Sequence, residues 1–219
     1  MIKIENIIKP SPAQWEAVIR GMRNPMNSWN KSDSYKTYIE DAETLATADF
    51  AFFVGDEDLK LMKNLAKAGS DHRKYLRMIP VYMDITAPFY WWKEFDTYKV
   101  GTVANSCSTM HKIHSKNVTL DDFSHEHLTM KAERCLLKII EAINEYRNEF
   151  VCTNERRFWW QMIQLLPSSY NQRRTVMLNY ETLWAMYQAR KNHKLDEWKQ
   201  FCDVIGDLPY FKEIFGIES

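Results

Sequence analysis

One short segment of the chain, residues 103–109 (VANSCST), gathers side chains that can do chemistry. It holds one amide, three hydroxyls and one thiol within seven residues. None of these is a large apolar side chain, so each needs a polar partner in the protein or in a ligand. The segment is therefore the first candidate for a binding site.

Nucleophilic catalysis and metal binding are the two other kinds of chemistry that the residues suggest. Cys107 has His111 four residues on, which a helix could bring together, but this pair alone is weak evidence for a nucleophile. The spacings of His111 with His114 and of His125 with His127 could ligate a metal. No third type of ligand clusters with them in the sequence, so we expect no metal site.

The elements around this segment are predicted from hydrophobic periodicity. Residues 61–68 keep one apolar face over a helical turn, and Gly69 stands where a left-handed C-cap belongs. Residues 81–85 alternate between apolar and polar or aromatic side chains, the period of a half-buried strand. Pro88 fits the first turn of a following helix, because the missing N–H is not needed there.

The N-terminal part predicts a strand, a helix, a loop and a second strand. Residues 2–8 alternate as a strand does, and Ser11 can cap a helix with Pro12 at its first position. The apolar face of that helix consists of Trp15, Val18, Ile19 and Met22. Residues 24–37 are polar and predict a solvated loop, and residues 48–54 predict a buried strand.

The C-terminal half predicts three helices and a strand. A helix over about 128–149 begins after a cap at Asp121 or Asp122. Its apolar stripe, for a core or a subunit interface, consists of Ala132, Cys135, Leu136, Ile139, Ile140 and Ile143. A helix over 154–166 ends at Pro167, and the strand TVMLN ends at Asn179, which can cap the next helix.

Composition limits the classes of function. The 219 residues include 29 Lys and Arg and 29 Asp and Glu, so no net field favours nucleic acid or membrane surfaces. Only six glycines occur and no glycine-rich phosphate loop. The four cysteines show no paired spacing, and no signal peptide or long apolar run is present. We expect a soluble cytoplasmic protein with one domain over residues 1–219.

Two motif blocks resemble those of the flavin-dependent thymidylate synthases (ThyX). The family has a helix of the form LMKxLxKxG, a strand ending in APxF, a helix and the signature RHRxxSxNxxSxR. Without a gap, the signature falls on residues 98–110 (YKVGTVANSCSTM), where Asn105 and Ser108 match.

The second block lies near the C-terminus. The family's VLP tripeptide and its NxRxLxxFLxLR motif correspond to Leu165-Leu166-Pro167 and to residues 179–190. Asn179, Leu183 and Arg190 match the second motif, while Glu181 stands where the family has an arginine. The resemblance covers about residues 57–205.

The resemblance implies an α/β (α+β) fold, an antiparallel sheet covered by helices, in a cytoplasmic homotetramer. It implies methyl transfer to dUMP, giving dTMP for nucleotide biosynthesis, with FAD, methylenetetrahydrofolate and NADPH. Arg190 is then the catalytic, uracil-facing cation, and Ser108 donates to the nucleotide phosphate. Lys99, Asn105 and Asn179 contact the flavin cofactor, and all five residues converge on one cleft.

Several cations of the family pattern are replaced in this chain. Tyr98, Val100, Met110 and Ile163 stand where the family has arginines, and Lys99 stands in place of a histidine. A charged hydrogen bond is worth about 1.5–3 kcal/mol, so four losses weaken nucleotide and FAD binding by orders of magnitude.

Two functional interpretations follow from these replacements. One is a divergent flavin-dependent thymidylate synthase. The other is a non-catalytic relative that binds another nucleotide or a protein partner. We expect weak or absent FAD binding. The pairs Arg156-Arg157 and Arg173-Arg174 could compensate for lost phosphate ligands, although ordinary ion pairs or solvation are the simpler expectation for both.

Overall fold

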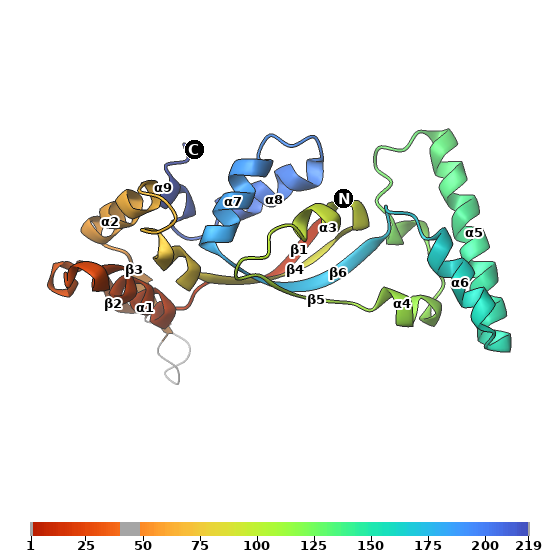
Figure 1. The fold of residues 1–219 in the computed structure, drawn as a ribbon, viewed down its shortest axis with the longest axis horizontal. Helices are drawn as coiled ribbons and strands as arrows, with labels where there is room; N and C mark the ends of the chain where they lie inside the picture. Colours follow the sequence, from red (N-terminus) through yellow and green to blue (C-terminus); the bar gives the residue numbers. More distant parts are fainter. Residues whose placement is uncertain (1, 40–48, 219) are drawn as a thin grey trace. The chain divides into compact units, whose positions relative to one another are not determined.

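The computed structural model describes residues 2–39 and 49–218 (Figure 1). The described chain divides into two compact units. Unit 1 holds residues 2–5, 84–99 and 104–176, and unit 2 holds 6–39, 49–83, 100–103 and 177–218. Whether residues 1–219 behave as one domain stays a prediction.

An antiparallel sheet of four strands confirms the predicted α+β class. Its order is β1 (Lys3–Ile8), β4 (Pro80–Pro88), β6 (Asn171–Asn179) and β5 (Val103–Ser106). In β4 the predicted alternation is confirmed, because Val81, Met83 and Ile85 are buried and Tyr82 is exposed. Boundaries between the units fall within all four of these strands.

Strand β5 departs from the loop predicted over 103–109. It occupies an edge of the sheet, and all of its side chains are exposed. No apolar alternation marks it in the sequence, because backbone pairing rather than side-chain burial defines it. Pro88 also differs from its prediction by one position: it ends β4 and is the N-cap residue of α3 (Phe89–Phe95).

Helix α1 (Pro12–Arg23) in unit 2 begins and packs as predicted. Ser11 and Gln14 form a reciprocal capping box, and Pro12 is the first helical residue. The predicted apolar face is buried: Trp15, Val18, Ile19 and Met22. Helix α2 (Asp56–Lys67) ends before Gly69, whose φ of 105° confirms a positive-φ position after the helix.

A two-stranded hairpin in unit 2 corrects the prediction for residues 48–54. Strand β3 (Asp49–Phe53) pairs antiparallel with β2 (Tyr35–Ile39), and Ala48 lies outside the described residues. Phe50 and Phe53 are 42% and 43% exposed, so the expected burial is wrong. Phe50 and Phe53 lie three residues apart and therefore on opposite faces of β3, so neither face of the strand is fully covered.

The loop predicted over 24–37 contains two short helical turns, and the prediction is wrong for residues 35–37, which belong to β2. These are the 3-10 turns η1 (Asn24–Met26) and η2 (Trp29–Lys31). A third turn, η3 (Lys74–Met78), leads into β4 and buries Tyr75 and Leu76.

Three C-terminal helices complete unit 2. They are α7 (Tyr180–Arg190), α8 (Asp196–Gly206) and α9 (Phe211–Phe215). The Trp184 ring stacks on Phe215 with a centroid separation of 4.2 Å, and the buried Tyr180 hydroxyl donates to the Pro209 carbonyl. Aromatic area therefore supplies much of this core.

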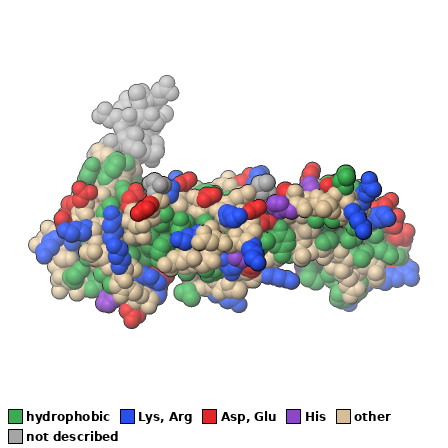
Figure 2. Space-filling model, turned by 90° about the horizontal axis from the view of Figure 1, so that it is seen from above, with side chains coloured by type: hydrophobic (Ala, Val, Ile, Leu, Met, Phe, Trp, Pro, Cys, Tyr) green, Lys and Arg blue, Asp and Glu red, His purple; other side chains and the backbone are tan. Residues whose placement is uncertain are grey.

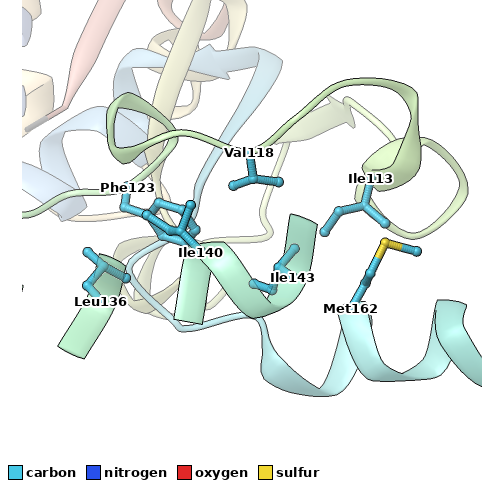
Figure 3. Packing of buried hydrophobic residues seen from close by; sticks show 7 residues of the cluster. All are labelled: Ile113, Val118, Phe123, Leu136, Ile140, Ile143 and Met162. Atoms are coloured by element: carbon cyan, nitrogen blue, oxygen red, sulfur yellow. The ribbon is translucent and has the colours of Figure 1, made fainter. Parts of the chain in front are cut away.

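Two adjacent helices form much of unit 1, α5 (Met130–Thr153) and α6 (Arg156–Leu165) (Figure 1). The shorter helical elements of this unit are α4 (Thr109–Lys112), η4 (Ile113–Ser115) and η5 (Leu120–Asp122). Figure 3 shows the apolar cluster that joins these short elements to α5 and α6. It consists of Ile113, Val118, Phe123, Leu136, Ile140, Ile143 and Met162.

The stripe predicted for α5 is confirmed at Leu136, Ile140 and Ile143 but wrong at Cys135, which is exposed. One residue corresponds to about 100° of helical rotation, so Cys135 lies a quarter turn from Leu136. The predicted cap is also wrong. Thr129 caps α5, whereas Asp122 accepts from the backbone of Thr119 at the start of η5.

Charged side chains of both signs are interspersed on the face seen in Figure 2. This distribution agrees with the equal counts of acidic and basic residues. Among residues 2–39 and 49–218, no helix has the length and apolar character needed to cross a bilayer.

Candidate functional site

A surface cleft of about 540 Å³ lies in unit 1, where β5 leads into α4. We name it the Ser108 cleft. Its polar lining residues are Ser106, Cys107, Ser108, Thr109, His111, Gln172 and Arg174. Its apolar lining residues are Phe89, Met110, Ile163 and Leu166. The cleft thus has hydroxyls and a guanidinium alongside apolar side chains.

Hydrogen bonds from β6 and α6 fix the loop that carries the hydroxyls. The Cys107 N–H donates to the Arg173 carbonyl at 2.9 Å. Gln172 Nε2 donates to the Cys107 carbonyl and to Thr109 Oγ1, at 3.1 and 3.2 Å. Trp159 Nε1 donates to the Met110 carbonyl at 2.9 Å. The loop is therefore held at both of its ends.

Ser108 lines the cleft and also begins α4. Its Oγ accepts from the His111 N–H at 3.3 Å, which is an N-cap bond. That bond uses the oxygen as acceptor and leaves the hydroxyl proton to be donated elsewhere. The structural role and a ligand role are compatible at this residue.

Arg174 forms the ion pair that the sequence interpretation expected, and it also lines the cleft. Its Nη1 donates to Asp96 at 2.7 Å, its Nε donates to Gln172 Oε1 at 3.0 Å, and its Cζ lies 4.1 Å from the Trp92 ring centroid. The side chain is 15% exposed. The strand period contains the missed signal, since Gln172 and Arg174 lie on one face of β6.

Arg173, on the opposite face of β6, has a different environment. It pairs with Asp84 at 2.6 Å and is 47% exposed. Thr175, two residues on, donates to the same carboxylate at 2.6 Å. Because side chains alternate along β6, Arg173 forms an exposed ion pair on one face, whereas the Arg174 guanidinium lies in the cleft on the other.

Lys99 and Asn105, two other predicted site residues, are exposed in unit 1. Lys99 follows α3, and Asn105 belongs to the edge strand β5. Neither is among the described residues that line the Ser108 cleft. Their predicted contacts with a flavin stay a prediction.

Asn179 and Arg190 belong to unit 2, at the two ends of α7. Asn179 is a buried N-cap whose Oδ1 accepts from the Thr182 N–H at 3.0 Å and whose Nδ2 donates to the Gly101 carbonyl at 3.2 Å. The Arg190 guanidinium lies over the Trp198 ring, 4.8 Å from its centroid. The predicted convergence of these two residues with Ser108 stays a prediction.

The fit of this chain to FAD can be judged from the contacts around residue 100. Val100 is 66% exposed and has no side-chain donor, and both functional groups of the Asn179 amide are already engaged. Glu181, which replaces an arginine of the family pattern, places a carboxylate beside Arg73 with an N–O distance of 2.9 Å. These residues do not fit the pyrophosphate of FAD, which needs cationic partners.

Metal chemistry has no candidate centre among residues 2–39 and 49–218. No group of three or more His, Cys, Asp or Glu side chains that could hold an ion is found there. The nearby histidine pairs in the sequence do not gather a third ligand in this part of the chain.

Comparison with known proteins gives a fold but no sequence match. No protein-family model matches the sequence, and no curated protein matches it. Two structures of the flavin-dependent thymidylate synthase ThyX from Helicobacter pylori, each with FAD and dUMP, superimpose with TM-scores of 0.62 and 0.64. Both are 14% identical to this chain and match 97% of it, over 95% and 94% of their own lengths. The chain therefore has a fold like that of ThyX.

Proposed function

We propose that this protein binds a nucleoside monophosphate of the dUMP class in the Ser108 cleft. The observation that carries the proposal is the two-sided lining of that cleft. Ser106, Ser108 and Arg174 offer donors for a phosphate, while Phe89 and Leu166 offer apolar surface for a base and sugar. Ligand pockets commonly combine a mostly apolar wall with a few convergent polar groups in this way.

The volume and the fold support the same ligand class. A cleft of about 540 Å³ is in the range of small-molecule sites. The ThyX structures that resemble this chain contain dUMP, and the serine of the family signature corresponds to Ser108. A pyrimidine nucleotide is therefore the first ligand to test.

A second candidate function is flavin-dependent methylation of dUMP to dTMP, with FAD, NADPH and methylenetetrahydrofolate. The likeness to ThyX over 97% of the chain favours it. In this candidate Arg190 activates the uracil, while Lys99, Asn105 and Asn179 contact the flavin. Because this subunit does not fit the FAD pyrophosphate, the missing cations would have to come from neighbouring subunits of a homotetramer. A cytoplasmic location belongs to both candidates.

Titration calorimetry with dUMP tests the primary proposal. We expect micromolar to millimolar binding that weakens in Ser108→Ala by about 1 kcal/mol, because one hydroxyl donor is lost. Ser115→Ala is the matched control, since Ser115 is an exposed serine of unit 1 that donates to the Lys112 carbonyl outside the cleft. Undetectable dUMP binding to the folded protein would refute the proposal.

Visible absorbance tests the second candidate on the same preparation. We expect purified protein without flavin bands, no uptake of added FAD and no rescue of a thymidine-requiring strain. Stoichiometric FAD together with dUMP-dependent oxidation of the reduced flavin would establish the second candidate instead.

A further inference from the structure

Arg174 presents a guanidinium whose orientation is fixed before any ligand arrives. Trp92 supports its face, and Gln172 and Asp96 each accept one hydrogen bond from it. Among the described residues no hydrogen-bond partner is found for Nη2. A planar guanidinium held in this way retains a donor edge for a second anion.

The rest of the cleft supplies little competing positive charge. Met110 and Ile163, which line it, stand at positions where the ThyX pattern has arginines. Arg174 is the only lysine or arginine among the described residues that line the cleft. An anionic ligand in the cleft would therefore bind to Arg174.

Asp96 is a counter-ion of Arg174 whose carboxylate is accessible to solvent. It follows α3 as the C-cap residue, and its side chain is 50% exposed, whereas that of Arg174 is 15% exposed. Asp96 is not among the described lining residues of the cleft. Because the Asp96 side chain is half exposed, water can solvate its carboxylate once another anion takes its place on Arg174.

We propose that Arg174 receives the phosphate of the bound nucleotide, and that Asp96 is its exchangeable counter-ion when the cleft is empty. This inference rests on the proposed nucleotide function and adds to it a phosphate ligand and a regulator of affinity. Binding replaces one anion on Arg174 by another, so Asp96 lowers the affinity of the cleft for phosphates. The ligand and the Asp96 carboxylate compete for one guanidinium.

Three variants test the exchange by calorimetry with dUMP, deoxyuridine and inorganic phosphate at low salt. Asp96→Asn removes the competing charge and should tighten dUMP and phosphate binding about threefold to tenfold. Arg174→Gln should weaken dUMP binding tenfold or more, about the value of a charged hydrogen bond. Arg173→Gln is the control, because Arg173 lies next along β6 but pairs with Asp84 outside the cleft; it should change affinity less than about twofold.

Deoxyuridine separates a phosphate contact from general damage to the cleft. Its affinity should be the same in all three variants, because it has no phosphate for Arg174 to bind. Should Arg174→Gln fail to fold, as judged by thermal melting, Asp96→Asn decides alone. In that case unchanged phosphate and dUMP affinity overturns the inference.

Failure of the inference and failure of the proposed function give different results. If dUMP binds equally to wild type, Asp96→Asn and Arg174→Gln, the function stands and Arg174 is not the phosphate ligand. If inorganic phosphate follows the expected pattern but dUMP binds no better than phosphate, the exchange stands and the nucleotide function fails. Absence of binding by both probes to both wild type and Asp96→Asn overturns both.

Discussion

Gly101 and Asn179 form a contact in unit 2 that leaves no room for one extra carbon atom. Gly101 has a φ of 66°, in the left-handed region, and a Cβ built there would lie 2.4 Å from Asn179 Nδ2. The same amide caps α7 and donates to the Gly101 carbonyl. A side chain at residue 101 therefore disturbs a turn and a helix start together.

Gly101→Ala should lower the free energy of unfolding by about 2–4 kcal/mol, from positive-φ strain and loss of the Asn179 bonds. Gly216→Ala is a matched control, because Gly216 has the same φ of 66° but nothing within 4 Å of a built Cβ. It should cost only about 1–2 kcal/mol. Urea unfolding measures both values, and equal losses would contradict the steric contact with Asn179.

At the scale of elements, a buried carboxylate joins α2 to the loop before β2. Asp58 is fully buried and accepts from Arg23 Nε at 2.5 Å and from the hydroxyls of Ser32 and Ser34, each at 2.6 Å. Burial alone would raise the pKa of Asp58, but these hydrogen bonds and the Arg23 charge hold it below its ordinary value. The carboxylate thus stays ionised inside unit 2.

Because the pKa of Asp58 is lowered in the folded state, the folding stability depends on pH in the acid range. Stability from this group is present above the unfolded pKa of about 4 and is lost as pH falls through the lower, folded pKa. Asp58→Asn should cost about 3–5 kcal/mol at neutral pH, because Arg23 is left buried without its partner. It should also flatten the acid side of a pH–stability curve from urea titrations.

Asp207→Asn is the control for Asp58, since Asp207 pairs with Lys212 but its side chain is 77% exposed. It should change stability by less than about 1 kcal/mol. If the stability of Asp58→Asn falls as steeply at acid pH as that of wild type, other carboxylates cause the loss of stability in acid.

Helix α5 packs against the rest of unit 1 through one apolar face. Ile143 is fully buried in the cluster of Figure 3, whereas Leu137 on the same helix is 43% exposed. Ile143→Ala should lower the unfolding free energy by about 2–5 kcal/mol, from lost burial and a cavity. Leu137→Ala should cost less than about 1 kcal/mol. Thermal or urea unfolding that ranks them in reverse would contradict this packing.

At the scale of the whole molecule, the sequence predicts the elements whose burial follows a period. The stripes at Trp15 to Met22 and at Leu136 to Ile143 predict α1 and α5, because apolar side chains at helical spacing must face a core. Strand β5 escapes prediction, since an exposed edge strand has no burial pattern. The burial expected of residues 48–54 is wrong at Phe50 and Phe53, because β3 belongs to a sheet of only two strands, which covers less apolar surface than a larger sheet.

The candidate site was predictable in part, for a related reason. Hydroxyls close together in the sequence identified the loop at Ser108, and the motif resemblance agreed with the ThyX-like fold. The Arg174–Asp96 pair joins residues 78 positions apart, and no local pattern encodes such a partnership. Contacts between residues far apart in the sequence can therefore be identified only once the fold is known.

Oligomeric state is the remaining prediction for the whole molecule. The resemblance to ThyX implies a homotetramer, and Met130 and Val151 on α5 are 80% and 57% exposed in the single chain. Sedimentation velocity at micromolar concentration should give about four times the mass of one chain. A monomer at that concentration would rule out the tetramer.

The four cysteines have a practical consequence. Cys107 lines the Ser108 cleft, while Cys135 and Cys152 are exposed on α5, outside the described lining. Cys202 is buried, and burial raises its pKa to about 11, so it reacts slowly with alkylating reagents. An alkylation footprint read by mass spectrometry would therefore report cleft occupancy from Cys107, with Cys135 and Cys152 as internal standards in every molecule.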